Sequence, residues 1–157
     1  MSTSIRRVTL LAVLALLAAC ERGEQRLQNG DADVAAIAAV NEQLLGALNE
    51  GDWAKLNELT DPDYVAIIGG NPIQGKARLD AANQSFLEQW RNEERWIPDE
   101  TIVDGDLAVQ RGSFTMTLTP RQGAGEARDL AGTYVHVYQR KTHGWALTRA
   151  VAATSGE

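Results

Sequence analysis

The densest set of side chains that could exchange protons lies in the last third of the chain, in the sequence Tyr-Val-His-Val-Tyr. Tyr134, His136 and Tyr138 alternate with valines, so on a β-strand their three side chains point to one face. A histidine between two phenols could act as a general acid and base, or could orient a bound molecule. If this face is turned outward, the alternate residues, Val135 among them, line the inner side instead. Periodicity leaves both orientations open, because both faces are half apolar.

A second chemical feature is the single cysteine, Cys20. With the preceding Leu17-Ala18-Ala19 it resembles the bacterial lipobox, in which the cysteine thiol accepts a diacylglyceryl group. A pair of arginines and a short apolar run stand before it, in the order of a secretory signal. That run, about twelve residues, is shorter than the roughly 20 needed to cross a bilayer. We therefore expect residues 1–19 to be a signal peptide and Cys20 to be the lipidated first residue of the mature protein.

The inventory of reactive side chains excludes several classes of site. Because Cys20 is the only cysteine, the mature chain has no internal disulfide, thiol nucleophile or cysteine metal cluster. The two histidines, His136 in a predicted strand and His143 in a predicted turn, supply no metal-ligand set of the usual spacing. No glycine-rich phosphate loop connects a strand to a helix. We expect no metal and no cofactor.

The charge of the mature chain is strongly negative. Removing the signal takes away two arginines, so 15 basic residues become 13 against 21 acidic residues, a net charge near −8. An acidic surface repels phosphate backbones, which argues against nucleic acid as a partner. It also argues against a polybasic contact with anionic lipid. The membrane contact is therefore expected through N-terminal acyl chains alone, in an extracytoplasmic location on the inner or the outer membrane.

The mature chain is organised as a tether and one domain. Residues 20–32 are polar and are expected to be a lipidated tether, and residues 33–157 are enough for one domain with its own core. Apolar spacing predicts a helix from an N-cap at Asp33 to Gly51, and a short second helix capped by Asp52. A third helix is predicted after Gly75, with a charged turn at 91–95 beyond it.

The last third of the chain is predicted to be β-structure. Four strands are separated by loops, two of which carry Asp-Gly and His-Gly turns that favour hairpins. An earlier short strand, beginning at Tyr64, ends in the turn cluster of residues 69–72. Helices followed by an antiparallel meander indicate an α+β fold. The predicted meander strands are 96–103, 107–119, 130–140 and 145–153.

This order of elements resembles the nuclear transport factor 2-like superfamily, in particular its ketosteroid isomerase-like and polyketide cyclase-like members. The likeness extends over residues 33–153 and rests on local passages at 48–53, 59–64, 105–109 and 138–145. It implies a cone-shaped α+β barrel, with N-terminal helices packed on a curved antiparallel sheet around a pocket. Such domains include isomerases, dehydratases, hydrolases and binding proteins, so the resemblance alone assigns no chemistry.

The catalytic groups of ketosteroid isomerase are absent at the positions that the resemblance implies. Leu44 stands where the tyrosine donor would be, Ile67 where the carboxylate base would be, and Val135 or His136 where the protonated aspartate would be. Asp61 is expected to be a turn residue next to proline. Enolisation of the steroid type is therefore not expected.

Several side chains are candidates for ligand binding: Asn83, Trp90, Tyr134, His136, Tyr138 and Arg149. Arg149 is placed inward or at a pocket rim by its spacing from Trp145 and Leu147, where it could hold a carboxyl group. The leading interpretation is a non-catalytic module for a small apolar or weakly acidic molecule. One alternative is an enzyme that uses His136 with Tyr134 or Tyr138. Another is a homodimer or protein-interaction module, in which Trp90 and Phe114 close the pocket and the outer face of the sheet makes the contact.

Overall fold

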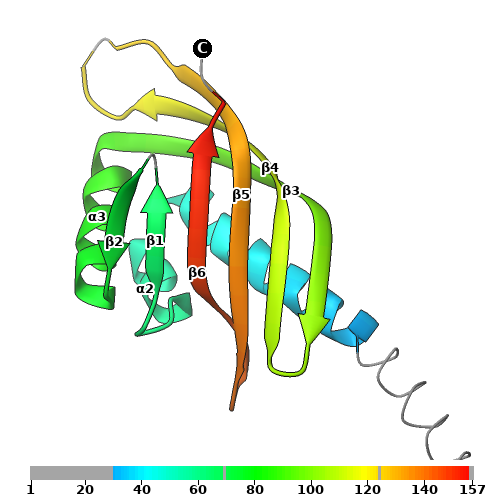
Figure 1. Ribbon diagram of the computed structural model, residues 1–157. Helices are drawn as coiled ribbons and strands as arrows, with labels where there is room; N and C mark the ends of the chain where they lie inside the picture. The colour runs from blue at the N-terminus through cyan, green and yellow to red at the C-terminus, as the bar shows by residue number, and fades with distance from the viewer. Residues whose placement is uncertain (1–29, 69, 124, 156–157) are drawn as a thin grey trace, which may run out of the picture. The chain divides into compact units, whose positions relative to one another are not determined.

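The computed structural model describes residues 30–68, 70–123 and 125–155. Residues 36–157 form one compact unit, which contains the sheet and the helices that cover it (Figure 1). The expected signal peptide, Cys20 and most of the expected tether lie outside the described residues. None of the helices in the described ranges has both the length and the apolar character required to cross a bilayer.

Three helices occur in the described chain: residues 30–50, α2 (Trp53–Leu59) and α3 (Lys76–Gln89). The predicted start of α2 is confirmed, since the Asp52 carboxylate accepts the Lys55 N–H at 2.9 Å. The first helix already includes residues 30–32. The predicted N-cap at Asp33 is therefore wrong, and helical structure extends into the end of the segment expected to be a tether.

The strands are β1 (Val65–Ile68), β2 (Asn71–Gln74), β3 (Trp90–Asp104), β4 (Leu107–Pro120), β5 (Arg128–Lys141) and β6 (Gly144–Thr154). They form one open six-stranded sheet in the order β2-β1-β6-β5-β4-β3. The predicted antiparallel meander is confirmed for β3 to β6. However, β1 pairs with β6 in parallel, so the sheet is mixed where a purely antiparallel one was expected.

The second strand, β2, was not predicted. Its first residues, Asn71 and Pro72, belong to the cluster expected to be a turn, but they pair with β1 at the edge of the sheet. Proline lacks an N–H, and an edge strand can accommodate it without losing a ladder hydrogen bond. The edge position explains why a sequence typical of a turn is compatible with a strand here.

Residues 91–95 are not the charged turn that the sequence predicts, but part of β3. Trp90, Asn92, Glu94 and Trp96 are more buried than the residues between them. That period of two places these four side chains on the inner face of the strand. A bulge between Pro98 and Glu100 then shifts the register against β4.

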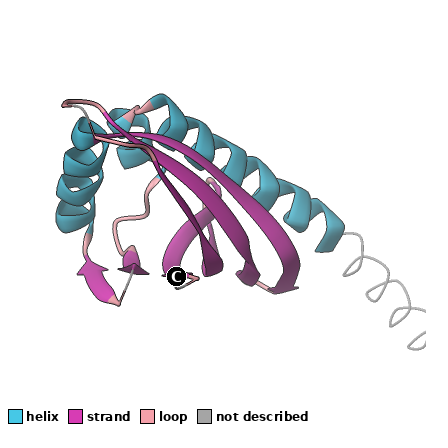
Figure 2. Ribbon diagram, turned by 90° about the horizontal axis from the view of Figure 1, so that it is seen from above, coloured by secondary structure: helices cyan, strands magenta, loops and turns pink. Residues whose placement is uncertain are grey.

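The helices cover one face of the curved sheet, and the core lies between these two layers (Figure 2). The first helix contributes Ile37, Leu44 and Ala47 to the core, and the sheet contributes Tyr138 and Trp145 among others. A helix stripe and a sheet face that are both apolar must be buried against each other, and this yields the two layers. The expected α+β class is confirmed, with a sheet that does not close into a barrel.

The end of the first helix is attached to the free edge of β3 by one side chain, Asn49. Its Nδ2 donates to the Glu94 carbonyl at 2.9 Å, and its Oδ1 accepts the Glu94 backbone N–H at 2.7 Å. The amide of Asn49 thus occupies the place that a neighbouring strand would take. This contact fixes where the helix crosses the sheet.

One glycine is required by close packing of the sheet. A Cβ at Gly112 would lie 2.3 Å from the Ile97 carbonyl oxygen and 2.9 Å from the Tyr134 hydroxyl. Because the first of these is a backbone atom, it cannot move away cheaply. Gly112 therefore allows β3 and the Tyr134 ring to approach β4.

We predict that Gly112→Ala lowers the free energy of unfolding by about 1–3 kcal/mol, because the new methyl group overpacks the sheet. Urea unfolding followed by circular dichroism measures this change. Gly46→Ala is the matched control, since Gly46 lies in the first helix and a Cβ there meets nothing within 4 Å. It should stabilise the protein by about 0.5–1 kcal/mol through helix propensity. Equal effects of the two substitutions would contradict the packing argument.

Candidate functional site

Tyr134, His136 and Tyr138 face the inner side of the sheet. Their exposed fractions are 3%, 4% and 0%, whereas Val135 between them is 42% exposed. Of the two orientations that the sequence left open, the inward one is therefore observed. The outer face instead carries a row of apolar side chains on adjacent strands, in which Ile67 pairs with Val151 and Val151 with Val135.

The inner polar groups form a connected hydrogen-bond network with the first helix. The Tyr138 hydroxyl donates to Asn41 Oδ1 at 2.6 Å, and Asn41 Nδ2 donates to Gln110 Oε1 at 2.9 Å. The same Gln110 oxygen accepts the Tyr134 hydroxyl at 3.1 Å, while Gln110 Nε2 donates to Thr101 at 2.9 Å. Each of these buried polar groups therefore has a partner, as stability requires.

The network determines which ring nitrogen of His136 carries the proton. The Tyr138 hydroxyl has one proton and donates it to Asn41, while its oxygen lies 3.2 Å from His136 Nδ1. Nδ1 must therefore be the donor in this contact, which leaves Nε2 as a lone-pair acceptor in the neutral ring. The ring also lies edge-on to Trp96, with centroids 4.6 Å apart, and 4.3 Å from the Tyr134 ring.

Burial keeps the ionisable members of this network in their neutral forms. It lowers the pKa of His136 to about 3. Burial, with a smaller effect from the charge of Asp99, raises the pKa of Tyr134 to about 12. Burial likewise raises the pKa of Tyr138, although its hydrogen bond to Asn41 opposes this. At neutral pH the imidazole carries no charge and both phenols keep their protons.

A carboxyl group that the sequence analysis did not select lies on the same inner face. Glu94 is half-buried, and its Oε1 accepts the Trp96 indole N–H at 2.7 Å. Burial raises the pKa of Glu94, while its hydrogen bonds from Trp96 and Asn92 lower it. The charge of Glu94 in turn adds to the effect of burial in raising the pKa of Tyr64. The inner face therefore has an acidic end on β3.

The residues that sequence reasoning missed carry two different local signals. Asn92 and Glu94 alternate with Arg91 and Glu93, between two tryptophans that also fit the alternation. A count of matches to a period of two across residues 90–96 would have assigned them to a strand. Asn41 sits within the apolar stripe of the first helix, and a polar residue there indicates a buried hydrogen bond.

Two further candidates lie on or next to α3. Asn83 is a half-buried residue of that helix. Trp90 ends the helix and begins β3, and the Arg128 guanidinium lies 5.2 Å from its ring centroid. Phe114, which one alternative expected to close the pocket with Trp90, is 6% exposed and belongs to the buried core. Trp90 remains on the inner face, at the end of β3 nearest Asn92.

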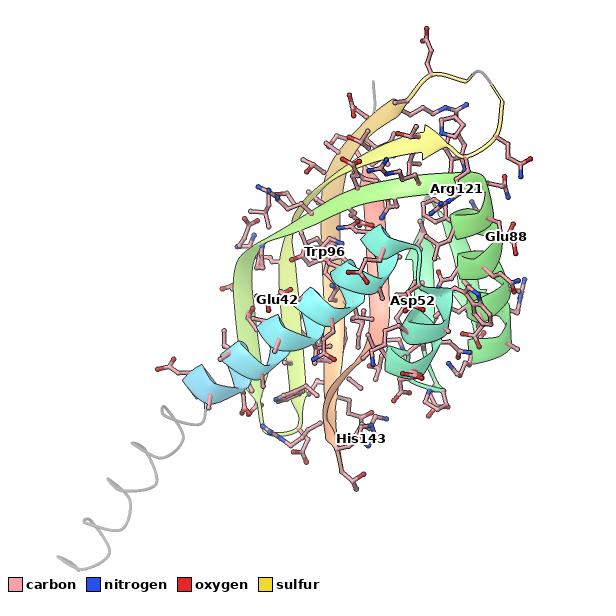
Figure 3. The ribbon with its side chains drawn as sticks, turned by 180° about the vertical axis from the view of Figure 1, so that it is seen from behind. Glu42, Asp52, Glu88, Trp96, Arg121 and His143 are labelled. Carbon is pink, nitrogen blue, oxygen red and sulfur yellow. The ribbon has the colours of Figure 1, made fainter. Side chains whose placement is uncertain are left out.

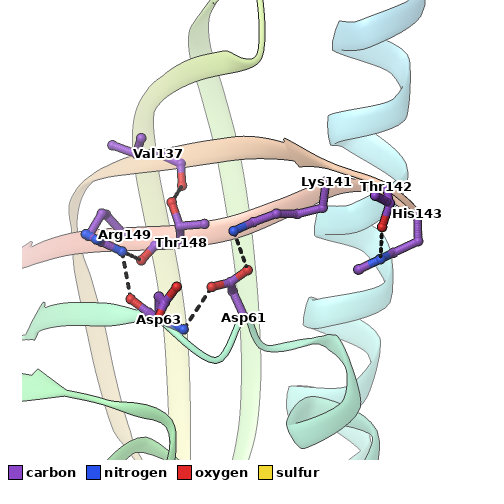
Figure 4. A network of polar contacts seen from close by, with 8 residues as sticks. All are labelled: Asp61, Asp63, Val137, Lys141, Thr142, His143, Thr148 and Arg149. Carbon is purple, nitrogen blue, oxygen red and sulfur yellow. Dashed lines mark hydrogen bonds and ion pairs between the residues drawn. The ribbon is translucent and has the colours of Figure 1, made fainter.

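Arg149 does not point inward, and the expectation that it shares a face with Trp145 and Leu147 is wrong. The register between β5 and β6 shifts at Val137 and Tyr138, which makes Thr148 an extra residue on β6. Beyond this bulge the odd-numbered residues of β6 point outward instead of inward, so Arg149 is exposed. Its guanidinium donates to the Asp63 carbonyl at 2.8 Å and to the Thr148 carbonyl at 2.7 Å (Figure 4).

The positions compared with ketosteroid isomerase have no shared inner location. Leu44 is a core residue with 5% exposure, whereas Ile67 is 41% exposed on the outer face. Of the alternatives Val135 and His136, only the histidine is inward. A carboxylate base and its two donors are therefore not brought together at these positions.

A surface groove of about 1000 Å³ lies away from the inner network, between residues 57–63 and the β5–β6 hairpin. Its charges compensate one another: Lys141 Nζ lies 3.1 Å from the buried carboxylate of Asp61, and Arg140 pairs with Asp106 at 3.2 Å. Asp61 also accepts the Asp63 N–H at 2.8 Å, as expected of a turn residue (Figure 4). Within the described ranges, no three His, Cys, Asp or Glu side chains are grouped so that they could hold a metal ion.

Comparison with known proteins identifies the domain type. Residues 41–147 match the SnoaL-like domain family. No curated protein matches the sequence. A conserved protein from Planctomyces limnophilus has a similar structure, with a TM-score of 0.72 and 28% identity over 80% of this chain and 99% of that one.

Two other solved structures support the fold. A ketosteroid isomerase-like protein from Erwinia carotovora has a TM-score of 0.70 at 20% identity and covers 80% of this chain and 98% of its own. A nuclear transport factor 2-like superfamily protein from Salmonella enterica has a TM-score of 0.68 at 15% identity, covering 77% and 89%. At these identities the likeness establishes the architecture and leaves the chemistry to the side chains.

The lowered pKa of His136 predicts a specific loss of stability in acid. Between about pH 6.5 and pH 3 this histidine binds a proton only in the unfolded chain, so acidification favours unfolding by about 1.4 kcal/mol per pH unit. From pH 7 to pH 4.5, wild type should therefore lose about 2–3 kcal/mol more than His136→Asn.

Urea unfolding at a series of pH values measures this difference. The raised pKa of Glu94 acts in the opposite direction, but it is common to both proteins and cancels from the comparison. His143→Asn changes the other histidine, in the exposed β5–β6 turn, and its stability curve should run parallel to that of wild type. If His136→Asn also runs parallel, His136 is not held neutral by the fold.

Proposed function

This chain belongs to the SnoaL-like domain family, and from that premise we propose that it is a lipid-anchored binding protein of the cell envelope. It holds a small, largely apolar molecule against the inner face of the sheet and does not transform it. The curved sheet carries Trp96, Tyr134 and Tyr138 on its inner face, and ligand sites in proteins are mostly apolar with a few placed polar groups.

The observation that carries this proposal is the state of the inner acid–base groups. General acid–base catalysis is most efficient when the pKa lies near the working pH. The pKa of His136, about 3, lies well below pH 7, and the pKa of Tyr134, about 12, lies well above it. The hydrogen bonds of Tyr138 are directed to Asn41 and His136 rather than to an open space. This arrangement favours binding over proton transfer.

The ligand is placed at the half-buried part of the inner face. Tyr134, His136 and Tyr138 are covered and act as the support, while Trp90, Glu94 and Trp96 are partly accessible. Figure 3 shows this side of the sheet, with the first helix crossing the strands next to Trp96. An aromatic surface at the rim of a helix-covered sheet offers apolar contact to a molecule of modest size.

Binding is tested with a panel of small neutral aromatic and alicyclic compounds added to the full chain, followed by nuclear magnetic resonance of the indole N–H signals. We expect saturable shifts of the Trp96 signal, weakened binding in Trp96→Ala, and full recovery of each compound unchanged. Trp53→Ala is the control, because Trp53 is 44% exposed on α2. If no compound of the panel gives a saturable shift, the proposed function is contradicted. If a compound is converted to a product, the protein is an enzyme and not a binding protein.

Membrane attachment is proposed to depend on Cys20 alone. The sequence Leu17-Ala18-Ala19-Cys20 supports lipidation, and several acyl chains hold a protein firmly where one does not. Cys20→Ala should remove the acyl-dependent mass from the N-terminus and abolish processing of the signal. Mass spectrometry of the membrane fraction measures both. A mature, unlipidated N-terminus in the wild-type protein would rule the anchor out.

A further inference from the structure

Two hydrogen-bond acceptors without sufficient donors lie next to each other on the inner face of β3. Asn92 is 1% exposed. Its Oδ1 is the only buried side-chain nitrogen or oxygen without a hydrogen-bond partner among the residues that the structure describes. Its Nδ2 donates to Asn49 Oδ1 at 3.3 Å and approaches Glu94 Oε2 at 3.4 Å. These contacts fix the amide orientation, since turning it over would set the Asn92 amide oxygen against two other acceptors, Asn49 Oδ1 and Glu94 Oε2.

The neighbouring carboxyl group of Glu94 lacks a cation. Within the described residues, no lysine or arginine forms an ion pair with it, although Arg91 pairs with Glu93 on the opposite face of the same strand at 3.3 Å. Its strong contact is the Trp96 indole N–H on Oε1, which leaves Oε2 with only the long approach of Asn92. A partly buried carboxylate without a positive partner is costly to the fold, as is a buried amide oxygen without a donor.

The remaining groups nearby add acceptors and aromatic surface rather than positive charge. His136 presents Nε2 as an acceptor, because its Nδ1 donates to Tyr138. The one arginine considered as an anchor for an acidic ligand, Arg149, is bound to carbonyl oxygens on the outside. The ring of Trp96, beside Glu94, can also attract a cation. The inner face therefore complements a molecule rich in donors, and repels an acid.

We propose that Glu94 is the recognition point for a protonated amine carried on an apolar body. Its ammonium group pairs with Glu94 Oε2, while the apolar body lies against Trp96. This inference rests on the proposed binding function and specifies the class of molecule bound. An ammonium group supplies the positive charge that this carboxylate lacks, which a neutral alcohol cannot do.

The test compares three probes with one ring and different head groups: 2-phenylethylamine, 2-phenylethanol and 3-phenylpropanoate. Each is titrated at pH 7 into the full chain, purified in a nonionic detergent, and followed by tryptophan fluorescence with a micelle-only blank. We expect the amine to bind about tenfold or more tightly than the alcohol, and the anion to bind most weakly.

Glu94→Gln is the decisive variant, because it removes the charge and retains an oxygen for the Trp96 indole. It should abolish the preference for the amine and leave binding of the alcohol within about twofold of wild type. Glu93→Gln is the matched control, one residue away with a side chain that is 63% exposed, and it should keep the full preference. Glu94→Gln should also unfold at a higher temperature than wild type, since a buried charge is removed.

The outcomes separate the two proposals. If the amine and the alcohol bind equally to wild type, or if Glu94→Gln keeps the amine preference, the amine site is overturned while a binding function stands. If none of the three probes and no compound of the neutral panel binds, the proposed function itself fails. If Glu93→Gln and Glu94→Gln lose the preference for the amine to the same extent, the preference comes from general surface charge, and the amine site is again overturned.

Discussion

The contact between the Tyr138 hydroxyl and Asn41 is the constraint on which the inner face depends. It joins the middle of the first helix to β5 at 2.6 Å, across 97 residues of sequence, at a tyrosine with no exposed surface. Because the phenol gives its one proton to Asn41, the tautomer of His136 follows, and Gln110 is oriented to receive Tyr134. Removing one partner would leave several buried polar groups unpaired, so these residues act as a unit.

The sequence was sufficient for most of the fold because periodicity and turn chemistry are local. The caps at Asp52 and Gly75, the strands after Gly105 and Gly144, and the α+β class all follow from short-range signals. The parallel pairing of β1 with β6 depends on residues about 85 positions apart, and no local pattern specifies it. The strand β2 was missed for a different reason: its sequence does carry local signals, but they are those of a turn.

The site was only partly predictable, and the two main errors, at Arg149 and at Glu94, have different origins. Tyr134, His136 and Tyr138 were chosen correctly as one face, but one residue of shift would have turned that face outward. At Thr148 such a shift does occur, and it moves Arg149 to the outside. Glu94 was overlooked because its charged neighbours resemble a solvated turn, although its own side chain faces Trp96. The sequence therefore predicted a positive side chain, Arg149, inside the domain, whereas the structure has a negative one, Glu94.

The contact of Asn49 with β3 also bears on how copies of the protein meet one another. β3 is the last strand of an open sheet, and an exposed strand edge can pair with the edge of another molecule. At Glu94 both backbone groups on that edge are already bonded to one side-chain amide. When two copies of this chain meet, the backbone of Glu94 therefore has no free N–H or C=O group to offer to a strand of the other copy.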